Sequence, residues 1–268
     1  MNRRLAVAVA AMALSSTCCT GGSDNGDTSG GVEHWSGMVS DLRFTWSSDP
    51  GIDLLTGPAV PIRAFVESVQ LAQYAGNLDY AYPGFEQATA EQPPADVPWS
   101  QRPSLDHALT KPLIGTDRYH ILSIARNGRT VAATICNFRY AVASERQDGT
   151  FESAGQTGVG DAKGIDVVRV ALTEPSSPSD LPPQSGPEPA PSNDVFGEWT
   201  VTGLLNFFAS GKPGFDTAWP SYREDIASCV DKAPSSLEER QFFVDGEHPR
   251  NDFPTSPPSP GWPAPPSQ

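Results

Sequence analysis

The dipeptide Asn127-Gly128 lies at the centre of a stretch rich in β-branched and aromatic residues, DRYHILSIARNGRTVAATICNFRYAVAS, residues 117–144. Asn-Gly is suited to a two-residue type I′ turn, because both central residues of that turn have positive φ angles. We therefore expect an antiparallel hairpin folded about this dipeptide, with Arg126 opposite Arg129.

This register predicts which side chains share a face, because alternate residues of a strand point to the same side. It places His120 opposite Ile135, with Cys136 on the other face of the hairpin. The face that carries the histidine is otherwise apolar. It comprises His120, Leu122, Ile124, Val131, Ala133 and Ile135.

The remaining periodic segments predict one long helix, further strands and a short second helix. Residues 58–76 have apolar side chains at helical spacing and end at a glycine. Residues 164–173 and 197–208 have the pattern of strands, and the proline-rich segment 174–194 is expected to join them as an extended loop. Residues 221–230 are expected to form a short helix.

A helical region followed by antiparallel strands indicates an α+β fold. In element order over residues 55–210, and in GEWTVTGLL as a last strand, the chain resembles the NTF2-like (SnoaL, ketosteroid-isomerase) family. The resemblance implies a curved antiparallel sheet of about four strands that forms a cone around the N-terminal helical region. Another α+β sandwich is the alternative. The segments DPGIDLLTGPAVPIRAFVES and GNLDYAYPGF also resemble those of uncharacterised actinobacterial exported lipoproteins, a likeness that implies no activity.

The N-terminal residues have the composition of a secretory leader, which we place at residues 1–18. Two arginines precede an apolar run at residues 5–14 that is too short to span a membrane. Residues 19–31 are expected to be a flexible Gly/Ser/Asp spacer. In LSSTCCTGG, Cys18 or Cys19 is the predicted lipid attachment site, and plain cleavage to a secreted protein is the alternative. The membrane, reached through this anchor on the extracytoplasmic face, is thus an expected partner.

Charge and cysteine usage narrow the functional classes. A net charge of −14 without basic clusters argues against nucleic acid as a partner. Cys136 and Cys229 are predicted to form a disulfide, because an oxidising exterior favours pairing of two isolated cysteines. No metal site and no cofactor is expected, since the cysteines and histidines lack ligand spacing and no nucleotide-binding motif has the necessary context.

We expect residues 32–250 to form a single α+β domain and residues 251–268 to form a disordered proline-rich tail. Within the domain, His120 is the candidate general base, because imidazole titrates near neutral pH. The alternative is a hydrogen-bonded core histidine. Asp79, Tyr80 and Tyr82 are candidates for the pocket mouth, with core packing of the tyrosine rings as the alternative.

Three functions remain open on these observations. The first is a non-catalytic, lipid-anchored envelope protein that binds a small apolar ligand or an envelope protein. The second is a small isomerase- or hydratase-like enzyme that uses His120 in the cone pocket. The third is a structural scaffold held near the cell wall by its proline-rich tail.

Overall fold

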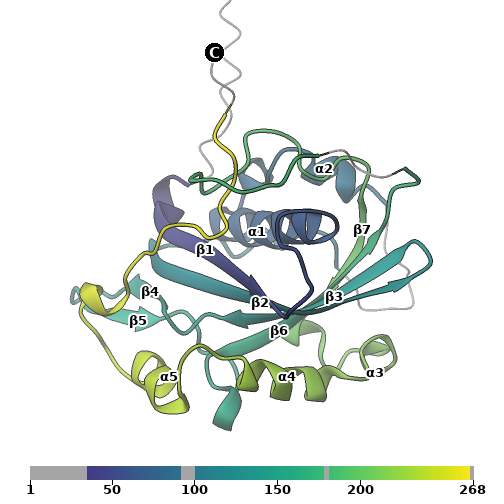
Figure 1. Cartoon of the computed structure of the whole chain (residues 1–268). Coiled ribbons are helices and arrows are strands. Elements are labelled where there is room, and N and C mark those ends of the chain that lie inside the picture. The colour runs from purple at the N-terminus through teal and green to yellow at the C-terminus, as the bar shows by residue number, and fades with distance from the viewer. Residues whose placement is uncertain (1–34, 92–99, 178–180, 266–268) are drawn as a thin grey trace, which may run out of the picture. The chain divides into compact units, whose positions relative to one another are not determined.

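The computed structural model describes residues 35–91, 100–177 and 181–265, which lie in a unit spanning Val32–Gln268. They form an α+β fold around a seven-stranded, mostly antiparallel sheet that does not close (Figure 1). The predicted leader, the spacer, Cys18 and Cys19 lie outside the described residues. Within the described residues, no helix has the length and apolarity needed to cross a bilayer.

The sheet is built on the predicted hairpin, β2 (Leu113–Asn127) and β3 (Thr130–Phe138), and has more strands than the expected four. Its order is β5-β4-β2-β3-β6-β7, and β1 pairs with β2 in parallel. The other strands are β1 (Asp41–Ser48), β4 (Val142–Glu145), β5 (Phe151–Ser153), β6 (Ile165–Thr173) and β7 (Thr200–Leu205).

The helices lie on both faces of this sheet. The α-helices are α1 (Ala59–Ala75), α2 (Phe85–Ala88), α3 (Phe215–Ala218), α4 (Tyr222–Asp231) and α5 (Leu237–Val244). Short 3-10 turns are η1 (Gly37–Val39), η2 (Leu78–Tyr80), η3 (Gly160–Ala162), η4 (Phe207–Ala209) and η5 (Arg250–Asp252). Figure 1 shows α1 on one face, with α3, α4 and α5 on the other.

The predicted register of the hairpin is wrong at the turn. Asn127 pairs with Thr130, so that Gly128 and Arg129 form the two-residue loop. Gly128 has φ 61°, and no non-glycine residue of the described chain has a positive φ. A positive φ at the first central residue alone is the pattern of a type II′ turn, which takes glycine there.

A β-bulge changes the face on which His120 lies. Ser123 pairs with Thr134, but Ile121 pairs with Ile135, so Leu122 is the extra residue. One extra residue interrupts the alternation of faces, so the residues before Leu122 point to the opposite face from the one that a register counted back from the turn predicts. His120 is consequently opposite Cys136 and shares the α4 side of the sheet with it, not the apolar α1 side that the unbulged register predicted.

Helix α1 is buried almost all round. Of its 17 residues 14 are buried, whereas a helix that covers one face of a sheet normally keeps a polar outer stripe. The outer side is covered by the segment between β6 and β7 and by the C-terminal segment. Phe196, Trp199 and Trp262 from these segments belong to the same hydrophobic cluster as α1. Gly76 ends the helix in the left-handed conformation, as predicted.

The prediction of disorder for residues 251–268 is wrong over the described part, which extends to residue 265. The backbone N–H of Trp46 donates to the carbonyl of Ser259 across 2.6 Å, and Trp262 is buried. The segment is rich in proline, but the Trp262 ring packs in the core and several backbone carbonyl groups of the segment accept hydrogen bonds from the domain. The proline-rich segment 174–194 does join β6 to β7, which pair in antiparallel.

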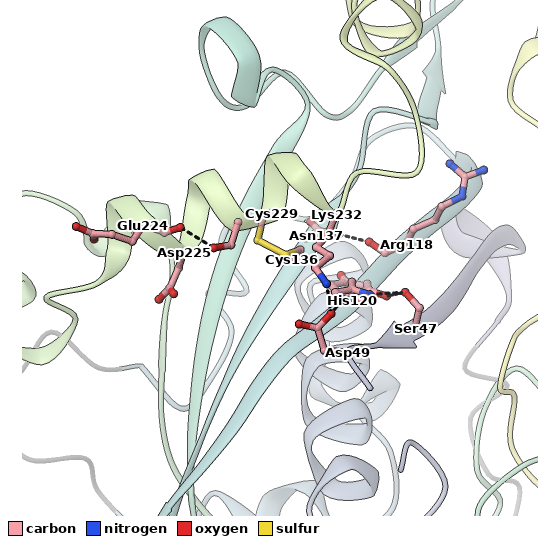
Figure 2. Close-up of a disulfide and its surroundings, with 12 residues drawn as sticks. Ser47, Asp49, Arg118, His120, Cys136, Asn137, Glu224, Asp225, Cys229 and Lys232 are labelled. Carbon is pink, nitrogen blue, oxygen red and sulfur yellow. Dashed lines mark hydrogen bonds and ion pairs between the residues drawn. A yellow bond between two sulfur atoms is a disulfide. The ribbon is translucent and has the colours of Figure 1, made fainter. Parts of the chain in front are cut away.

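The predicted disulfide is present between Cys136 on β3 and Cys229 on α4, with a Cα–Cα distance of 5.3 Å (Figure 2). Both cysteines are fully buried in a hydrophobic cluster between the sheet and α4, separate from the cluster that contains α1. The bond therefore attaches this helix covalently to the centre of the sheet.

Candidate functional site

His120 lies in a hydrogen-bonded group between β1, β2 and the end of α4 (Figure 2). Its Nδ1 is 2.8 Å from Ser47 Oγ, and its Nε2 is 3.1 Å from Asp49 Oδ1. Lys232, directly after α4, forms an ion pair with the same carboxylate. The Lys232 hydrogen bond lowers the pKa of Asp49, and the His120 contact acts in the same direction.

A serine, a histidine and a carboxylate in contact are the components of a nucleophilic triad. Here, however, the carboxylate also binds a lysine, and His120 borders none of the five main pockets of the described residues. The group ties two strands to α4. The bulge places His120 on the α4 side of the sheet, so it does not lie in a pocket beside α1 as expected.

The three residues expected at a pocket mouth, Asp79, Tyr80 and Tyr82, lie close together in the chain but differ in burial and in hydrogen-bond partners. Asp79 and Tyr80 are in η2, where the Asp79 backbone N–H donates to Asn77 Oδ1 at 2.9 Å. Tyr82 is buried, and its hydroxyl donates to Glu67 Oε2 across 2.7 Å. Asp79 and Tyr82 border a surface pocket of about 430 Å³ beside α2, and His120 is not part of its lining.

Glu67 is the centre of a buried polar cluster on α1 that was not predicted from the sequence. Besides Tyr82, the indole N–H groups of Trp46 and Trp262 donate to it at 2.6 and 2.9 Å. Burial raises the pKa of this carboxyl, while the neighbouring Arg63 and the three donors oppose that shift. These contacts use the carboxylate to hold three aromatic side chains, so we assign the cluster a structural role.

The strongest candidate for a ligand site is a pocket of about 460 Å³ beside the C-terminal half of α1. Val66 and Val69 of the helix form part of its wall, together with Val168 of β6. The two most deeply placed polar residues are Tyr119 of β2 and Asn137 of β3, which are 2% and 4% exposed. Apolar walls with a few convergent polar groups are typical of small-molecule sites. We call this cavity the α1 pocket.

A buried carboxyl lies directly beside the deep end of the α1 pocket. Asn137 Nδ2 donates to Asp117 Oδ1 at 2.5 Å, and the Tyr119 hydroxyl donates to Asp117 Oδ2 at 3.3 Å. Burial raises the pKa of Asp117 to about 7, although both hydrogen bonds favour the ionised form. The carboxyl can thus take up or release a proton near neutral pH.

Further charged groups surround this carboxyl in the same layer. Arg139 Nε lies 3.9 Å from Asp117 Oδ2, and the guanidinium stacks 4.9 Å from the centre of the Tyr74 ring. Burial lowers the pKa of Arg139 to about 10 and raises the pKa of Asp166, whose strand position is opposite Asn137. The arginine partly balances two carboxyl groups that would otherwise be buried without a counter-charge.

The sequence contains a signal for this site. Asp117, Tyr119 and Ile121 are alternate residues of β2, so the Asp117 carboxyl must share a face with two residues of the core. The unbulged register predicted the opposite face of β2 to be the core face, because a simple alternating pattern does not show the bulge at Leu122. No group of three or more His, Cys, Asp or Glu within the described residues could hold a metal ion.

No family model, curated protein or solved structure matches the chain. Its function is therefore inferred from the geometry of the α1 pocket and from the sequence.

Proposed function

We propose that the chain is an exported, lipid-anchored cell-envelope protein whose domain binds a small, largely apolar ligand in the α1 pocket. One observation carries this proposal: a pocket of about 460 Å³ has valine walls and ends on Tyr119 and Asn137. This volume lies within the roughly 300–1,000 Å³ range of small-molecule sites. The packing of α1 on the inner face of an antiparallel sheet supports the NTF2-like cone as the parent architecture.

Two observations support export and anchoring. Residues 1–18 have the composition of a leader, and Cys18 and Cys19 lie where it meets the spacer. The disulfide between Cys136 and Cys229 suits an oxidising compartment. Replacing both Cys18 and Cys19 by serine is expected to move the protein from the membrane fraction to the medium. Retention of the double variant in the membrane would contradict the lipid anchor.

A second candidate function is acid–base catalysis in the same pocket, and Asp117 is the observation that favours it. A carboxyl with a pKa of about 7 is suited to proton transfer near neutral pH. Asp117 replaces His120 as the residue on which an isomerase- or hydratase-like reaction would depend. The carboxyl lies behind Asn137 and Tyr119, so binding is the function that the geometry supports first.

The scaffold hypothesis has less support, because the proline-rich tail that would contact the wall is packed against the domain through Trp262. Its occupied backbone groups, such as the Ser259 carbonyl, are not available to a partner while this packing persists.

The binding proposal can be tested with Nile red, a neutral apolar dye whose fluorescence rises in apolar surroundings. Wild-type protein should bind it saturably with one site per chain. Gln70→Trp should abolish binding, because Gln70 lines the pocket and an indole there would occupy the cavity. Gln87→Trp, on the exposed side of α2, is the matched control and should bind normally. Equal binding by both variants would contradict the assigned site.

A further inference from the structure

The rim of the α1 pocket carries positive charge without negative charge. Arg102 and Lys212 line it and are exposed, and no aspartate or glutamate is among its lining residues. The whole chain has 32 acidic residues against 18 lysines and arginines, so a lining of this kind runs against its composition.

Other pockets of the described chain differ in this respect. Each of the four other main pockets has at least one carboxylate in its lining. These include Glu174, Asp148, Asp53 and Asp79. The α1 pocket therefore differs from these four pockets in the charge of its lining. In a protein with net charge −14, a local positive rim would attract an anionic ligand against the repulsion of the whole molecule.

We propose that the ligand of the α1 pocket is a small amphiphile with one anionic group, bound with its apolar body inside and its charge at the rim beside Arg102 and Lys212. This inference rests on the proposed binding function and adds the chemical class of the ligand. A carboxylate or a phosphate would satisfy the same two cations, which are the side chains that bind such groups.

The orientation follows from the two ends of the pocket. Asp117 lies behind the deep end, so an anion placed there would be repelled whenever this carboxyl is ionised. At the rim the anion meets two cations in solvent and loses little hydration. The neighbouring Phe208 ring is 73% exposed and lines the same rim, where it can cover an apolar chain that extends out of the cavity.

The test compares a matched pair of fluorescent probes, 11-(dansylamino)undecanoic acid and its methyl ester, titrated into the full-length protein at low salt. The acid should bind about threefold to tenfold tighter than the ester, because two exposed cations each contribute modestly to attraction in water. The preference should fall as salt is raised from about 20 to about 200 mM, where the Debye length shortens.

Arg102→Gln/Lys212→Gln should reduce the preference for the acid to less than about twofold while the ester binds unchanged. Lys111→Gln/Arg223→Gln removes the same charge outside the pocket and should keep the preference. Equal affinity of acid and ester, or a preference that survives the rim variant, would overturn the inference and leave the binding proposal intact. Failure of both probes to bind would overturn the two together.

Discussion

Trp262 donates its indole Nε1–H to Glu67 Oε2 across 2.9 Å, which joins residues 195 positions apart. The same ring stacks against the guanidinium of Arg63, 4.3 Å from its centre, and that guanidinium donates to the carbonyls of Pro260 and Gly261. Helix α1 thus binds the C-terminal segment through one carboxylate and one guanidinium, spaced four residues apart on its outer side.

The first prediction concerns this contact. Trp262→Ala should lower the free energy of unfolding by about 3–5 kcal/mol, the range for loss of a buried aromatic ring. Trp262→Phe keeps an aromatic ring but removes one donor to Glu67, so its cost should be smaller, about 1–3 kcal/mol. Chemical denaturation followed by circular dichroism measures both. Phe208→Ala, at an exposed ring, is the control; a Trp262→Ala protein as stable as this control would refute the role of the tail.

The hairpin shows how far the sequence determined this fold. Asn127-Gly128 and the alternating pattern predicted β2 and β3, because turn chemistry and periodicity are local properties. The bulge at Leu122 depends on contacts across the sheet, and the alternation of apolar and polar residues in the sequence does not indicate it. One unpaired residue was enough to move His120 from the expected pocket to the group with Ser47 and Asp49.

The tail and the α1 pocket were missed for a different reason. Composition describes an average, and residues 251–265 have the average of a disordered segment. The buried position of Trp262 depends on Arg63 and Glu67. Their spacing of four residues can be read from the sequence, but their partners are almost 200 residues away in the chain. Similarly, the α1 pocket brings together residues of α1, four strands and η4, which no short sequence pattern joins.

The second prediction is a pH dependence that arises from Asp117. Its pKa is about 7 in the folded protein, against 3.8 for an unperturbed aspartate. Between these values the folded state keeps a proton that the unfolded state has lost, so stability falls as pH rises, by up to about 1.4 kcal/mol per pH unit. This contribution is fully present below about pH 4 and is lost by about pH 7.

Asp117→Asn should remove that dependence, because the amide does not ionise. The difference in unfolding free energy, variant minus wild type, should increase between about pH 4 and pH 7 and then level off. Urea denaturation at several pH values, with the disulfide intact, measures this difference directly. A difference that is flat across the range, or that decreases with pH, would show that the carboxyl is ionised throughout in the folded protein.

The third prediction concerns the bond between Cys136 and Cys229, which are 93 residues apart. Replacing both by alanine should cost about 4 kcal/mol, since the unfolded chain regains the entropy of a long open loop. Thermal denaturation with and without dithiothreitol measures the effect. The reductant should lower the melting temperature of wild type and leave the double variant unchanged. A variant within about 1 kcal/mol of wild type would mean that other contacts of α4, such as Lys232 with Asp49, suffice to hold the helix.

The fourth prediction concerns Gly115, where β2 is paired with both β1 and β4. Its φ is +102°, and a Cβ at this position would lie 2.3 Å from the carbonyl oxygen of Ala141. Gly115→Ala should therefore cost about 2 kcal/mol or more of unfolding free energy, through backbone strain and displacement of the neighbouring chain.

Gly128→Asn is the control, because the turn at φ +61° has open space around it and asparagine tolerates that conformation. We expect it to change the unfolding free energy by less than about 1 kcal/mol. Equal effects of the two substitutions in chemical denaturation would contradict the close approach at Gly115.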